Sequence, residues 1–91
     1  MRFTWDQHKA TANLRKHAVS FPEATTVFAD PLALIVEDQL HAQREVIVGE
    51  SVTGGLLVVV FVETREDEIR IISARRATRH EWRRCENGEE S

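Results

Sequence analysis

The chain has 91 residues, enough for one domain with a single modest core. Its 42% hydrophobic and 30% charged residues are ordinary for a soluble globular protein, and its one cysteine, Cys85, excludes an internal disulfide. The longest apolar run, at 56–62, is too short to cross a bilayer, and no signal peptide follows Met1. We therefore expect one cytoplasmic domain spanning 1–91.

The formal net charge of −3 conceals a strongly uneven distribution. Residues 1–20 carry +3, residues 21–68 carry −8, residues 69–84 carry +5, and the last seven add −3. Six of the twelve Lys and Arg residues lie within 70–84. The pattern favours a basic end that meets phosphate and an acidic side that meets a basic protein, although solubility alone also produces such blocks.

The first third of the chain predicts a short strand and two helices. Phe3 and Trp5 alternate onto one face of a strand, and Asp6 can cap a helix over about 7–17. Ser20 and Glu23 have the spacing of a capping box for a second helix over about 21–29. Its apolar face comprises Phe21, Ala24, Thr25 and Phe28, and Asp30-Pro31 should end it.

The rest of the chain predicts four strands and a final helix. The β-branched runs are 32–36, 45–52, 56–62 and 68–74. Gly54-Gly55 suits a two-residue hairpin and 64–67 the next turn, so these strands should be antiparallel neighbours. The run at 56–62 should lie centrally, covered on both faces. A second capping box, "TRHE" at 78–81, predicts a helix from Thr78 to about Gly88. The fold class is α+β, with helices on one face of an antiparallel sheet.

Helical spacing sorts the side chains of the first helix into two stripes. Lys9, Asn13 and Lys16 should project from one face. Ala10, Leu14 and His17 should form the adjoining stripe that faces the sheet. His17 is a candidate for proton transfer, because its ordinary pKa lies near neutrality, or a partly buried histidine bonded to a carbonyl.

Arginines mark the final strand and its exit. Arg70 lies between apolar residues, where it either pairs with a carboxylate such as Glu45 or Glu63 or serves a ligand. Arg75 and Arg76 follow where the chain turns into a capped helix. Planar guanidinium groups at a helix N-terminus match the geometry and charge of phosphate.

Three motifs resemble the BrnT family. They are "W-D-x-x-K-x-x-x-N-L-x-K-H-x-V-S-F" from Trp5 to Phe21, "V-F-A-D-P-L-A" at 27–33 and "R-I-I-S-A-R-R-A-T-R-x-E" at 70–81. The resemblance implies a type II toxin with a RelE-like fold and ribonuclease activity, which inhibits translation and is neutralised by a BrnA-like antitoxin. It also implies a heterotetramer with an antitoxin dimer, and contact with DNA only through the antitoxin.

The resemblance assigns roles to particular residues. Cleavage by attack of the RNA 2′-hydroxyl needs proton transfer and stabilisation of charge on the phosphate, and arginine supplies only the second. The expected catalytic residues are Arg70, Arg75, His17 and Arg44, with His41 a second candidate for proton transfer. The expected RNA-binding residues are Lys9, Lys16, Arg76, Arg79 and Arg83. No metal or cofactor is expected.

The chain departs from the family pattern at Cys85, where relatives often have a tyrosine, and it contains no tyrosine at all. Trp82 could supply base stacking instead, or it could anchor a terminal helix. The alternative function is therefore a catalytically weak or inactive module that binds the antitoxin and modulates its DNA binding.

Overall fold

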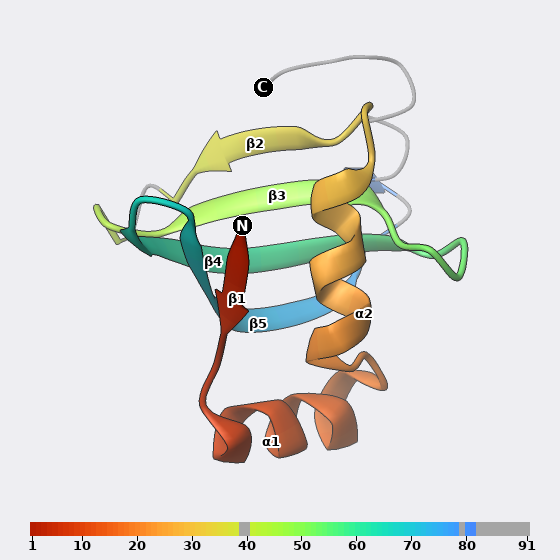
Figure 1. The fold of residues 1–91 in the computed structure, drawn as a ribbon. Helices are drawn as coiled ribbons and strands as arrows, with labels where there is room; N and C mark the ends of the chain where they lie inside the picture. The colour runs from red at the N-terminus through yellow and green to blue at the C-terminus, as the bar shows by residue number, and fades with distance from the viewer. Residues whose placement is uncertain (39–40, 79, 82–91) are drawn as a thin grey trace.

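The computed structural model of the chain describes residues 1–38, 41–78, 80 and 81. Its elements are β1 (Arg2–Thr4), α1 (Gln7–His17), α2 (Phe21–Thr26), the 3-10 helix η1 (Val27–Ala29), β2 (Leu34–Glu37), β3 (Glu45–Glu50), β4 (Leu56–Arg65) and β5 (Glu68–Arg76). The strands form one sheet in the order β1-β5-β4-β3-β2 (Figure 1). The α+β class is confirmed. No described helix is long and apolar enough to span a membrane.

Both predicted helices begin at their predicted caps. The Asp6 carboxylate accepts hydrogen bonds from the backbone N–H groups of His8 and Lys9, and α1 ends where Ala18 adopts a left-handed φ of 58°. The Ser20 hydroxyl accepts from the N–H of Glu23 and begins α2. The second helix tightens into η1 after Thr26 and ends before Asp30, as its Asp-Pro sequence predicts.

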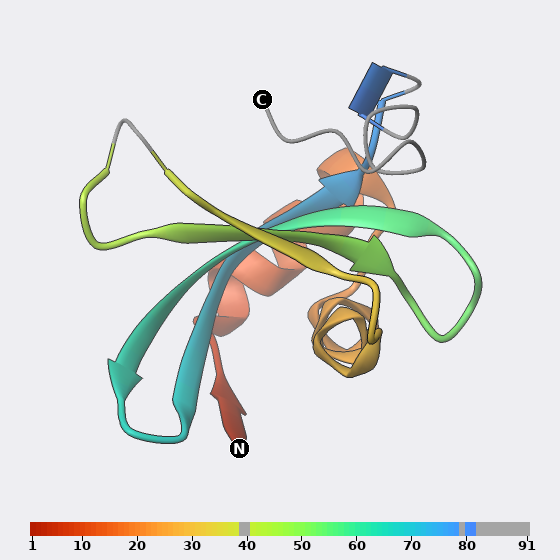
Figure 2. The ribbon, with the colours of Figure 1, turned by 90° about the horizontal axis from the view of Figure 1, so that it is seen from above.

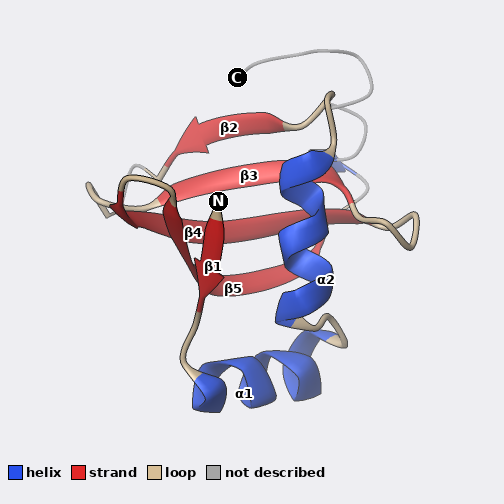
Figure 3. Ribbon diagram, in the orientation of Figure 1, coloured by secondary structure: helices blue, strands red, loops and turns tan. Residues whose placement is uncertain are grey.

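The core lies between α2–η1 and the face of the sheet that they cover (Figures 1 and 3). Phe28 of η1 packs edge-on against Phe61 of β4 at 5.0 Å between ring centroids, and Phe3 of β1 lies 5.2 Å from Phe28. Trp5 packs against Phe21 at 6.0 Å. The alternation of Phe3 and Trp5 onto the core face is therefore confirmed.

The sheet differs from the expected antiparallel arrangement at β1. This strand pairs in parallel with β5, because α1 and α2 separate it from the hairpins and leave it no antiparallel partner. The run at 56–62 is central, as predicted, since β4 lies between β3 and β5. The prediction that both faces of this run are covered was wrong. Val60 and Val62, on the face away from α2, are only half-buried.

The β3–β4 connection is longer than the predicted two-residue hairpin. β3 ends at Glu50, and the loop 51–55 is closed by a hydrogen bond from the Ser51 N–H to the Gly55 carbonyl. The cause lies in α2, whose Glu23 carboxylate accepts from the hydroxyls of Ser51 (3.0 Å) and Thr53 (2.6 Å). These bonds hold the loop against α2. The Glu23 carboxylate is therefore not used to accept a hydrogen bond from the Ser20 N–H, which would be the second half of the capping box.

Asn13 corrects the predicted faces of α1. Its side chain is buried, whereas Leu14 is 52% exposed, so the inward stripe consists of Ala10, Asn13 and His17. The Asn13 amide donates to the carbonyls of Val19 (3.0 Å) and Ala74 (2.8 Å), and its oxygen accepts from the Ala74 N–H (3.1 Å). Because β1 ends beside Arg70, this side chain takes the place of a partner strand along the rest of β5.

The capping box predicted after β5 is formed. The Thr78 N–H donates to Glu81 Oε1 at 2.8 Å, and the Glu81 N–H donates to the Thr78 hydroxyl at 3.2 Å. The remainder of the predicted helix to Gly88 lies outside the described residues. Hydrogen bonds from Arg75 and from the Thr78 N–H lower the pKa of Glu81 from 4.5 to about 2. This box therefore joins the end of β5 to the segment that follows it.

Replacing Asn13 by Ala is expected to lower the free energy of unfolding by about 3 kcal/mol, because it leaves three buried backbone groups without partners. Asn13→Asp should be at least as damaging, since a carboxylate cannot donate to the two carbonyls. Urea unfolding measures both changes, with Thr11→Ala on the exposed face of α1 as the control. An Asn13→Ala protein as stable as the control would contradict this role.

Acid should weaken the fold partly through Glu81. Its pKa is depressed in the folded state, so its stabilisation is complete above the unfolded value near 4.5 and is lost as the pH falls through about 2. The stability difference between the wild type and Glu81→Gln should therefore shrink between pH 4.5 and 2. Glu66→Gln, an exposed acid in the β4–β5 turn, is the control. A difference that stays constant to pH 2 would refute the assignment.

Candidate active site on the open face of the sheet

The face of the sheet that α2 and η1 leave uncovered carries arginines beside a field of valines. On β4 this open face presents Val58, Val60 and Val62, which lie in register with Arg75, Ser73 and Arg70 of β5. Figure 2 shows α2 on the opposite side of the curved sheet. The candidate site is therefore a surface of β5 and its neighbours, with apolar side chains beside cationic ones.

A bulge at Ile72 brings the two arginines to the same face. Val60 pairs with Ser73 and Phe61 pairs with Ile71, so Ile72 is an extra residue without a counterpart on β4. In a regular strand, residues five apart point to opposite faces. The bulge reverses the alternation, so Arg70 and Arg75 share the open face, about 13 Å apart along the strand.

Arg70 is a half-buried cation without an ion-pair or hydrogen-bond partner among the described residues. The proposed pairing with Glu45 or Glu63 does not occur, since their register with Phe61 and Ile69 places both on the opposite face. Hydrogen bonds from Lys9 and His8 lower the pKa of Asp6, and the charge of Arg70 adds to this effect. Arg70 is thus available to an anion.

Two further residues share the row of Arg70. Thr4 of β1 is its parallel partner, and the Thr4 hydroxyl is buried with no hydrogen-bond partner in the described part of the chain. On the other side lies Val62, the β4 partner of Arg70. Arg44 directly precedes Glu45, the first residue of β3, which pairs with Phe61 next to Val62. If the ladder is extended by one residue, the Cα atoms of Arg44 and Arg70 are two strand spacings, about 10 Å, apart.

Arg75 is already engaged. Its Nη1 and Nη2 donate to Glu81 Oε1 and Oε2 at 2.8 and 2.9 Å, which is a bidentate ion pair, although its side chain remains 41% exposed. This hydrogen bonding to Glu81 raises the pKa of the Arg75 guanidinium. The Glu81 carboxylate presents the same planar pair of oxygens that a phosphate would present.

The other expected residues lie on α1, at the end of β5 and in the β2–β3 connection. Lys9 and Lys16 are exposed on α1. His17 is half-buried about one turn beyond Asn13, toward the far end of β5, and Arg76 pairs with Leu57 on the helix-covered face. His41 lies in the β2–β3 connection, with Nδ1 3.3 Å from Asp38. Arg79, Arg83, Trp82 and Cys85 lie outside the described residues.

Sequence reasoning missed Thr4 and Ser73. Thr4 could have been found, because it alternates with Phe3 and Trp5 and so faces away from the core. Ser73 lies between the two arginines only because of the bulge, which no sequence feature announces. Within the described ranges no three His, Cys, Asp or Glu side chains are grouped as metal ligands.

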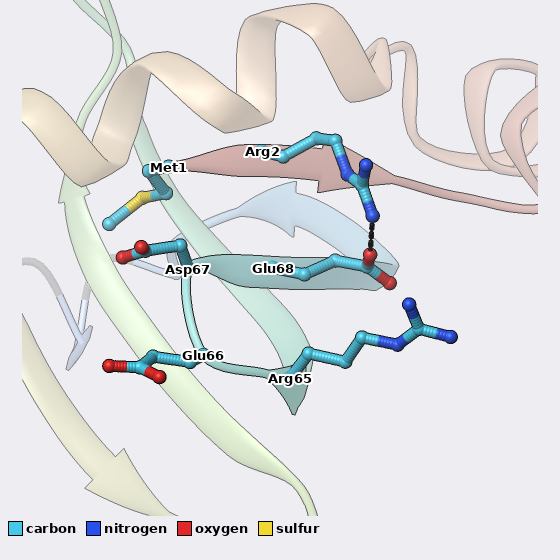
Figure 4. A pocket seen from close by; sticks show the side chains of 6 residues that line it. All are labelled: Met1, Arg2, Arg65, Glu66, Asp67 and Glu68. Atoms are coloured by element: carbon cyan, nitrogen blue, oxygen red, sulfur yellow. Dashed lines mark hydrogen bonds and ion pairs between the residues drawn. The ribbon is translucent and has the colours of Figure 1, made fainter.

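A hollow of about 330 Å³ lies at the β4–β5 turn, away from these residues. Figure 4 shows its lining by Met1, Arg2, Arg65, Glu66, Asp67 and Glu68, with Arg2 paired to Glu68. Hydrogen bonds from Thr64 and Arg2 lower the pKa of Glu68. The mixed charge of this hollow favours no single ligand, and it contains none of the expected catalytic residues.

Comparison with known proteins places the fold. The model of the family described as "Ribonuclease toxin, BrnT, of type II toxin-antitoxin system" matches residues 5–81. The crystal structure of the Brucella abortus ribonuclease toxin BrnT superposes with a TM-score of 0.73 at 23% identity, covering 87% of this chain and 99% of that one. No curated protein matches the chain. The match over residues 5–81 shows that the chain belongs to the BrnT family of ribonuclease toxins of type II toxin–antitoxin systems.

Proposed function

We propose that this chain is an endoribonuclease that cleaves RNA on the open face of its sheet, with Arg70 bound to the scissile phosphate. The observation that carries the proposal is the half-buried residue Arg70, which forms no hydrogen bond or ion pair with a described residue and lies in register with Thr4, whose hydroxyl is unbonded. Partial burial of an unpaired cation costs desolvation free energy, which a bound anion offsets. A phosphate of the RNA backbone is such an anion.

The proposed chemistry uses the substrate's own nucleophile. The RNA 2′-oxygen loses its proton to a base and attacks the adjacent phosphorus, and the bond to the 5′-oxygen breaks as that oxygen gains a proton. The products are a 2′,3′-cyclic phosphate and a 5′-hydroxyl. Arg70 stabilises the charge that develops on the phosphoryl oxygens, and Arg44 approaches the same phosphate from the other side of Val62.

Proton transfer is assigned to a histidine. His17 and His41 are the candidates: His17 ends α1, and the His41 carbonyl accepts a hydrogen bond from the Arg44 N–H at 3.0 Å. Lys9, Lys16 and Arg76 would bind flanking phosphates, together with Arg79 and Arg83. In the cell the expected consequence is loss of translatable RNA, relieved by a BrnA-like antitoxin that binds as a dimer to form a heterotetramer. The expected location is the cytoplasm.

The second candidate function is an inactive module that binds antitoxin. One observation favours it: Arg75 is neutralised by Glu81 in the free chain, which leaves fewer cations for RNA. The absence of tyrosine points the same way. The two functions differ in whether the purified chain cleaves RNA.

Purified protein is expected to cleave single-stranded RNA in the presence of EDTA, because Arg70 and the 2′-hydroxyl supply the charge and the nucleophile. Arg70→Ala should lower the cleavage rate by about a hundredfold, the usual effect of removing one charge-stabilising donor. Its melting temperature should stay close to that of the wild type, since no described ion pair is broken and Asp6 loses only the smallest of the effects that lower its pKa. Arg70→Lys should restore only part of the rate, because an ammonium lacks the bidentate geometry.

The control for Arg70 is Arg65→Ala, an exposed arginine in the β4–β5 turn, which should cleave at the wild-type rate. An active Arg70→Ala protein would refute the phosphate assignment. A wild type that is soluble and folded but cleaves no RNA would establish the inactive module instead.

Arg75 is expected to serve both the fold and the RNA. Because its carboxylate partner is partly exposed, Arg75→Ala should cost only about 1 kcal/mol of stability, in addition to weakening RNA cleavage. Glu81→Gln should also lower stability, but it frees the guanidinium and so should tighten RNA binding. Melting curves and RNA titrations of both variants separate these effects. If both variants lose stability and neither changes RNA binding or cleavage, Arg75 is purely structural.

A further inference from the structure

β2 ends the sheet, and no other described strand pairs with the outer side of its backbone. The hydrogen bond from the Asp38 N–H to the Arg44 carbonyl, at 3.2 Å, sets the alternation of the β2–β3 ladder. Residues 34, 36 and 38 direct their backbone groups toward β3. Ile35 and Glu37 therefore direct theirs away from the sheet, and each offers one N–H and one C=O.

This edge is only partly protected, because β2 is four residues long and carries the charge of Glu37. On β5, the Asn13 amide binds the outward backbone groups of Ala74, whereas β2 contains no lysine, proline or bulge. Ile35 is 59% exposed and Val36 is 50% exposed. Exposed β-branched residues beside unpaired backbone groups are the features that accept an added strand.

The charge around this edge selects the partner. Glu37 lies directly opposite Glu45, and Glu63 is the diagonal neighbour of Glu45 on the same face. None of the three forms an ion pair with another described residue. Like charges opposite each other destabilise a strand pair, so a Lys or Arg on an incoming strand would relieve this repulsion. A second copy of this chain would add three more carboxylates.

We propose that β2 docks an extended, basic segment of the antitoxin, which joins the sheet beside Ile35 and Glu37. The segment carries Lys or Arg in the row of Glu37 and Glu45, and an apolar side chain beside Val36. The inference rests on the proposed function only in taking the antitoxin as the partner. β2 lies three strand spacings, about 14 Å, from β5, so the docked strand and the RNA contact different strands.

Amide hydrogen exchange tests the strand addition directly. In the free protein, the amides of Ile35 and Glu37 should exchange fast and that of Val36 slowly, because only Val36 bonds to β3. In the complex with the co-expressed cognate antitoxin, Ile35 and Glu37 should slow by about a hundredfold or more. If both amides exchange as fast in the complex as in the free protein, the proposal is overturned.

A proline variant tests it through affinity. Ile35→Pro removes an N–H that no bond within the sheet uses, and its ring blocks an incoming strand. Binding to the antitoxin should weaken by about tenfold or more, whereas the matched control Ile35→Val should bind like the wild type. Glu37→Lys leaves the backbone intact and should weaken binding through charge, which keeps the test decisive even if Ile35→Pro fails to fold. Unchanged affinity in Glu37→Lys and in a folded Ile35→Pro would refute the proposal.

Two further readouts separate this proposal from others. The Ile35→Pro protein should still cleave RNA, but the antitoxin should no longer neutralise it. If the wild-type protein does not cleave RNA, the proposed activity is wrong, but the exchange and affinity tests of strand addition still apply. Sedimentation of the free protein should show a monomer. A dimer abolished by Ile35→Pro would assign the edge to a second copy and overturn the antitoxin assignment.

Discussion

The extra residue at Ile72 is the constraint on which the candidate site depends. It shifts the alternation of β5 by one position, and two consequences follow from that single change. Arg70, Ser73 and Arg75 meet on the open face, and the backbone N–H and C=O of Ala74 turn toward α1, where Asn13 binds them. Without the bulge, Arg75 would lie on the helix-covered face and Asn13 would lose its two bonds to Ala74. The packing of α1 and the placing of the arginines are thus one feature of the strand.

Side chains satisfy backbone groups of two strands beyond the ends of their shorter neighbours β1 and β2. Beside β5, a buried amide satisfies the backbone groups that β1 leaves unpaired. Beside β3, the Asp30 carboxylate accepts from the Glu50 N–H at 2.8 Å, just past the point where β2 begins, and this bond with that from Leu32 lowers the pKa of Asp30. Among the described residues, the outward backbone groups of β2 and those of β1, at the other end of the sheet, have no such partner. β2 is the longer of these two edge strands, and an open edge is a place where another chain is accommodated.

Much of this fold follows from local rules. Asp6 and Ser20 each offer a side-chain acceptor where a helix begins, and Asp30-Pro31 cannot continue one, so α1 and α2 were predictable to within a residue or a 3-10 turn. The strands were predictable from β-branched runs. The parallel pairing of β1 was not, because it depends on how the hairpins formed by β2, β3, β4 and β5 bring the last strand back beside β1. The long β3–β4 loop was missed since Glu23 of α2, distant in sequence, fixes it.

The candidate site was predictable in composition but not in arrangement. The cluster of arginines is visible in the sequence. The face of the sheet on which Arg70 and Arg75 lie depends on the bulge, and the pairing of Arg75 with Glu81 depends on the capping box. That partner makes the two central arginines unequal. RNA must displace the Glu81 carboxylate to reach Arg75, so phosphate binding there is weakened by the free energy of the ion pair, about 1 kcal/mol for a partly exposed pair. No described carboxylate has to leave Arg70, and its half-buried guanidinium gains more from an anion than an exposed one would. An acidic chain therefore places cations along β5 for two purposes: Arg75, near its end, fastens the strand's exit, and we propose that Arg70, near its start, holds the phosphate at which the chemistry occurs.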